Sequence, residues 1–149
     1  MTALVSMFAI GMIFLGGIVP AAEAAKRSSY VYAKVVAESS SIDGIVAGDR
    51  IYLAWETNKP LRINVADATD QVTTATAANV VVTKSDSTLT ITATLADSSI
   101  AGLHVGDVLT CSFDLVTETA SCVNETTGGS VSGHSVYVNV NMVTSTRHK

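Results

Sequence analysis

The first twenty residues, MTALVSMFAIGMIFLGGIVP, contain no Asp, Glu, Lys, Arg or His. A helix made from such a run has no polar face, so lipid or other protein must cover it on every side. Its apolar part, residues 3–19, is at the short end of the roughly 20 residues that cross a bilayer. Pro20 lacks a backbone N–H and is expected to kink the helix. We therefore predict that this segment is a membrane anchor or an element through which the protein assembles.

A cleaved secretion signal is the main alternative for this segment. The small residues Ala22-Glu23-Ala24 would suit a cleavage site. However, no positive charge lies near Met1, and the apolar run is long for a signal peptide. These departures favour a segment that the working protein retains.

The residues after the proline, AAEAAKR, are good helix formers. Tyr30, Val31 and Val35 have a spacing that would extend this helix to about Glu38. We therefore predict one helix over residues 1–40, apolar at first and amphipathic later. A first β-strand in SSYVYAKVV is the alternative, since Tyr and Val also favour sheets.

From Ser41 onward the hydrophobic period changes to two, which is typical of strands. Apolar and polar residues alternate in 88–95, 108–115 and 135–142, while 49–55 and 79–83 are predicted as further strands. The stretch 61–78 receives no assignment. Six to eight short strands separated by turn residues suggest an antiparallel sandwich or barrel. The predicted fold is α+β: a long N-terminal helix (1–40) and an all-β, sandwich-like head (41–149).

The two cysteines are consistent with a disulfide across a hairpin. If a tight turn is centred on Val116 and Thr117, Cys111 lies opposite Cys122. Opposed positions in an antiparallel pair are close enough for a bridge. Two buried free thiols are the alternative. A disulfide would place the protein outside the cytoplasm.

Sequence motifs for catalysis are not found. His104, His134 and His148 lie near turns or at the end of the chain, and no metal-binding, nucleophile or phosphate-binding motif appears. The net charge of −4 and the lack of a basic stripe argue against nucleic acid. We expect no enzyme activity and no cofactor. Asn124-Glu125-Thr126 forms an N-x-[ST] glycosylation motif in a glycine-rich loop that we expect to be exposed.

The start Met1-Thr2-Ala3-Leu4-Val5, followed by an apolar run with glycines and a proline near position 20, resembles the mature N-terminus of type IV pilin-like subunits. The resemblance covers about forty residues and is greatest to the archaeal branch, which includes adhesion pilins and archaellins. It implies that apolar helices bundle into a filament core while β-rich heads form the surface. The core residues implied are Leu4, Val5, Phe8, Ile10, Met12, Ile13, Phe14, Leu15 and Ile18.

The predicted function is a structural subunit of an extracellular helical filament that serves adhesion or motility. Its partners would be copies of itself, the membrane before assembly, and surface glycans. Two alternatives remain open at this point. One is a monomeric surface domain held by an N-terminal anchor, and the other is a secreted fibre subunit that assembles by exchanging a strand.

Overall fold

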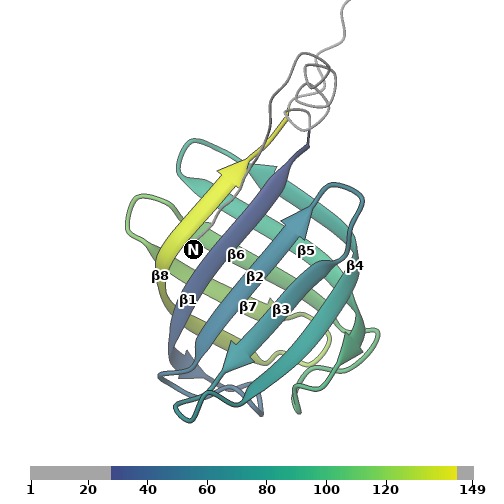
Figure 1. Cartoon of the computed structure of the whole chain (residues 1–149), viewed down its shortest axis with the longest axis vertical. Coiled ribbons are helices and arrows are strands. Elements are labelled where there is room, and N and C mark those ends of the chain that lie inside the picture. The colour runs from purple at the N-terminus through teal and green to yellow at the C-terminus, as the bar shows by residue number, and fades with distance from the viewer. Residues whose placement is uncertain (1–27, 144–149) are drawn as a thin grey trace, which may run out of the picture. The chain divides into compact units, whose positions relative to one another are not determined.

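The barrel is formed by residues Tyr30–Asn141 (Figure 1). The computed structural model describes residues 28–143. Its eight strands are β1 (Tyr30–Ser40), β2 (Arg50–Glu56), β3 (Leu61–Ala66), β4 (Val72–Lys84), β5 (Thr88–Ser98), β6 (Val108–Asp114), β7 (Thr119–Asn124) and β8 (Ser130–Asn141). Each strand pairs antiparallel with the next, and β8 pairs with β1. Every strand of the barrel therefore has a neighbour on both sides.

A second unit comprises residues 1–29 and 142–149, of which 28, 29, 142 and 143 are described. Within it the backbone N–H of Val143 donates to Ser29 Oγ at 2.9 Å. Among residues 28–143, no helix is long and apolar enough to cross a membrane.

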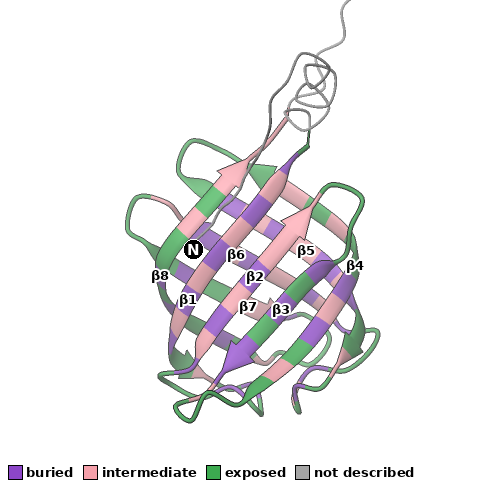
Figure 2. Ribbon diagram, viewed as in Figure 1, coloured by how far each residue is buried: buried purple, intermediate pink, exposed green. Residues whose placement is uncertain are grey.

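The barrel interior is filled by alternate residues of each strand (Figure 2). In β5, Leu89, Ile91, Ala93 and Leu95 are buried, while the threonines between them point outward. Such alternation is expected of a sheet that has one dry face and one wet face. The largest fully buried side chains include Phe113 of β6. The buried side chains together form one hydrophobic core inside the barrel.

The predicted helix over residues 1–40 is wrong in the part that the structure describes. Tyr30–Ser40 forms strand β1, in which Val31, Ala33, Val35 and Ala37 are buried and the intervening residues face outward. Burial of every second residue is the pattern of a strand with one buried face. The ladders to β2 and β8 provide hydrogen-bond partners for its backbone. The folded head thus begins at Tyr30 rather than at residue 41. The predicted filament-core residues, from Leu4 to Ile18, and Pro20 lie outside the described residues.

The predicted sandwich-like head is also wrong, because the sheet closes into one barrel. Alternation along a strand reports which face is buried, but it does not report whether the first and last strands pair. Here Tyr30 pairs with Asn141, and the ladder between β1 and β8 continues to Ser40 and Val131. The unassigned stretch 61–78 supplies β3 and the first half of β4.

The barrel consists of two similar halves, β1–β4 and β5–β8. The segment Ser40–Asp49, SSIDGIVAGD, corresponds to Ser98–Asp107, SSIAGLHVGD, 58 positions later. In both loops the serine hydroxyl bonds the backbone two residues on, at Ile42 and Ile100. In both, the final aspartate accepts an N–H from the residue three positions earlier, at 2.9 Å. The two loops place four buried apolar side chains at the same end of the barrel: Ile42, Ile45, Ile100 and Leu103.

The strand registers repeat as well. Across β8, β1 and β2, one outward row of residues is Tyr137, Lys34 and Tyr52. The corresponding row across β4, β5 and β6 is Val81, Thr92 and Thr110. Both ladders shift register next to these rows, between Ala78 and Val81 in one half and between Lys34 and Val35 in the other. Each position on one half therefore has a sister position on the other.

Candidate functional site

Histidine and acidic side chains form no metal-binding group in the described part of the chain. Among residues 28–143, no three His, Cys, Asp or Glu side chains come together as a metal-binding group. His134 Nδ1 lies 2.9 Å from Glu38 Oε2, and both side chains are exposed. His104 Nδ1 lies 3.8 Å from Asp107 Oδ2 at the edge of its loop. His148 lies outside the described residues.

Asn124 is not in the exposed position that its glycosylation motif suggests. It is 0% exposed, and its Nδ2 donates to Asp107 Oδ2 at 2.7 Å. Its Oδ1 accepts the backbone N–H of Thr126 at 3.0 Å. The backbone N–H of His104, and then the amide of Asn124, lower the pKa of Asp107. The buried amide therefore joins two loops, and it offers no accessible nitrogen for a sugar in the folded domain.

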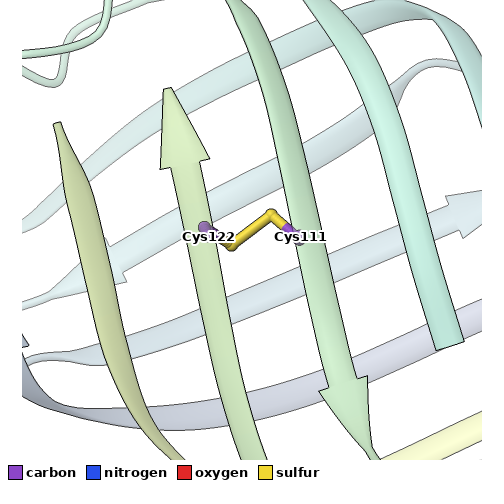
Figure 3. Close-up of a disulfide and its surroundings, with 2 residues drawn as sticks. All are labelled: Cys111 and Cys122. Carbon is purple, nitrogen blue, oxygen red and sulfur yellow. A yellow bond between two sulfur atoms is a disulfide. The ribbon is translucent and has the colours of Figure 1, made fainter. Parts of the chain in front are cut away.

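The disulfide joins Cys111 of β6 to Cys122 of β7 (Figure 3). The two residues face each other across the hairpin, in the register predicted from the sequence. The turn spans residues 115–118, and Asp114 Oδ1 accepts the N–H groups of Val116 and Thr117. At the sister positions in the first half, Leu53 pairs with Ile63. The bridge thus crosslinks a site that apolar packing fills in the other half.

All four tyrosines of the chain lie on adjacent strands and on the outside of the barrel. Tyr30 and Tyr32 belong to β1, Tyr52 to β2 and Tyr137 to β8. Lys34 of β1 lies between Tyr52 and Tyr137, and its Nζ is 5.5 Å from the centre of the Tyr52 ring. The rings of Tyr30 and Tyr32 are 5.4 Å apart. We call these five residues the tyrosine face.

Two tyrosines of this face have raised pKa values. Burial, followed by a hydrogen bond to Glu56, raises the pKa of Tyr32 to about 12. Burial, and then the nearby Tyr52, raise the pKa of Tyr137. The hydrogen bond from Tyr32 is the main cause that lowers the pKa of Glu56. The tyrosine face thus combines four aromatic side chains with one basic side chain, that of Lys34.

A surface pocket of about 180 Å³ adjoins this face near the end of β2. It is lined by Tyr32, Ala54, Trp55, Glu56, Lys59, Pro60 and Arg62. Trp55 is half-buried, and Lys59 Nζ lies 3.5 Å from Glu56 Oε1. Aromatic rings that combine apolar area with a polar edge are enriched where proteins contact partners. The face and its pocket are the best candidate for a binding surface on the barrel.

The tyrosine face is not among the features predicted from the sequence. The alternation of Tyr30 and Tyr32 with Val31 and Ala33 is a signal for it, but the helix prediction obscured that pattern. The SSIxG repeat is a second signal, because it aligns Tyr30, Tyr32 and Tyr52 with Thr88, Thr90 and Thr110.

Comparison with known proteins adds no assignment to this site. No protein-family model matches the chain, and comparisons with curated proteins and with solved structures also gave no match.

Proposed function

We propose that this chain is a structural subunit of an extracellular filament, with the apolar N-terminal segment as the assembly element and the barrel as the head. Two observations together carry the proposal: residues 3–19 form an uncharged run in the sequence, and the barrel closes without them. The barrel interior is already filled by its own side chains. The apolar run must therefore be covered by lipid before assembly and by other copies after it.

The closed barrel favours this route to polymers over strand exchange. A subunit that accepts a donor strand needs an unpaired sheet edge. Each barrel strand here has both neighbours in its own chain. The disulfide is consistent with a protein that works in an oxidising compartment. Adhesion or motility would follow from the polymer.

Placing a charge in the apolar run tests the proposal. We expect Ile13→Glu to raise the critical concentration for assembly of the full chain at least about tenfold, the effect of about 1.4 kcal/mol. The reason is that a carboxylate buried without a partner is strongly unfavourable. Sedimentation of polymer at increasing protein concentration measures the effect.

Val105→Glu is the matched control for this experiment. It introduces the same charge at a loop residue that is 67% exposed, so assembly should match the wild type. Equal assembly of Ile13→Glu and wild type would contradict the proposal. A wild-type chain that stays monomeric with its N-terminus intact would instead support an anchored single domain.

A further inference from the structure

The two halves of the barrel share a backbone plan, but the strands around β1 (β8, β1 and β2) and the strands around β5 (β4, β5 and β6) differ in what they present outward. Tyr32, Lys34 and Tyr52 of the first half correspond to Thr90, Thr92 and Thr110 of the second. Tyr137 corresponds to Val81. We call Val81, Thr83, Thr88, Thr90, Thr92 and Thr110 the threonine face.

The threonine face shows that the fold does not require tyrosine at these positions. Threonine and valine occupy equivalent outward sites in the same ladder pattern and next to the same register shift. Large aromatic side chains on an outer face therefore need a reason other than barrel stability. Aromatic rings are favoured in contact surfaces because they add large area at a low entropy cost.

The cations of the barrel are confined to its first half: Lys34, Arg50, Lys59, Arg62 and Lys84. Their positive charges offset most of the negative charges of the acidic residues in that half. Residues 85–141 contain neither lysine nor arginine, but they hold six acids: Asp86, Asp97, Asp107, Asp114, Glu118 and Glu125. Opposite potentials guide association and disfavour contacts between like surfaces. Two tyrosine faces would bring Lys34 near Lys34, whereas the threonine face contains no cation and has Asp114 beside Thr88.

The two faces lie on opposite sides of the barrel, because β1 and β5 are four strands apart in a closed ring of eight (Figure 1). We propose that the tyrosine face of one copy docks on the threonine face of the next copy. This inference rests on the proposed function, for which it supplies the contact between neighbouring heads. A contact between two different faces leaves one of each free, and so it extends into an open array.

Thiol crosslinking of the full chain tests this contact. Both native cysteines are held in the disulfide, so an added cysteine supplies the free thiol. Tyr52→Cys labels the tyrosine face, and Thr110→Cys labels the threonine face at the sister position. Each variant is assembled alone and in an equal mixture, and then treated with a short bismaleimide.

We expect covalent dimers in the mixture and little or none from either variant alone. The yield should fall as added salt screens the opposite charges. Dimers from Tyr52→Cys alone would show a symmetric contact and overturn the inference. Absence of dimers in the mixture would also overturn it and leave the tyrosine face to another partner, such as a surface glycan.

Electron microscopy of the same samples separates this inference from the proposed function. Filaments without mixed crosslinks would refute the contact and leave the filament proposal standing. Mixed crosslinks without filaments would support the contact and refute the filament. The variant Tyr52→Thr/Tyr137→Val, which copies the threonine face, should remain folded but lose most of the crosslink between Asn139→Cys, which lies beside Tyr32, and Thr92→Cys partners.

Discussion

Replacing Phe113 by alanine is expected to lower the free energy of unfolding by about 3–5 kcal/mol, as for other aromatic residues removed from cores. Phe113 is 1% exposed and is among the largest fully buried side chains of the barrel. Its neighbours belong to paired strands on both sides, so they have little freedom to collapse into the space. Equilibrium unfolding in urea, followed by circular dichroism, measures the loss.

Trp55→Ala provides the matched control for Phe113, because the two residues occupy sister positions in β2 and β6. Trp55 is only half-buried, so its removal should cost clearly less. A loss at Phe113 that equals the loss at Trp55 would contradict the burial assigned to this core.

Reduction of the Cys111–Cys122 disulfide is expected to lower the free energy of unfolding by about 3 kcal/mol, the value for a short loop in the chain-entropy model. The bridge spans a sequence separation of 11 residues, and it restricts the unfolded chain more than the folded hairpin. Urea unfolding with and without reductant measures the difference.

Cys111→Ala/Cys122→Ala should resemble the reduced wild type and should not respond to reductant. Since Leu53 and Ile63 fill the sister register without a crosslink, we expect the double variant to remain folded. A variant as stable as the oxidised wild type would show that the bridge contributes nothing to stability.

Strands β5 and β6 and the hairpin turn after β6 could be predicted well from the sequence. The alternation in 88–95 places every odd residue inside, and the turn at 115–118 fixes the position of Cys122 opposite Cys111. These features are local, because a strand face and a tight turn depend on neighbouring residues. The same reasoning applied to Leu61-Arg62-Ile63-Asn64-Val65 would have identified β3.

The first strand and the closure of the sheet could not be predicted in this way. The helix formers in AAEAAKR come directly before Tyr30, and tyrosine, valine and alanine occur in both kinds of element. Closure depends on the pairing of β1 with β8, which are about a hundred residues apart in the chain. The burial of Asn124 likewise depends on Asp107 in a different loop.

The candidate site depends on residues from distant strands. Tyr30, Tyr32, Tyr52 and Tyr137 form one face only because β8 returns beside β1. The repeat SSIxG in residues 40–44 and 98–102 is a local signal in the sequence. The repeat aligns the two halves, so that Tyr30, Tyr32 and Tyr52 correspond to threonines. It does not show that the tyrosines lie on one face of the barrel.

Electron microscopy of surface material sheared from the native source tests the central claim most directly. We expect filaments whose protein, analysed by mass spectrometry, is this chain with the apolar run of residues 3–19 still attached. A native protein that begins near Lys26, or one that is recovered only as single barrels with the run intact, would contradict it.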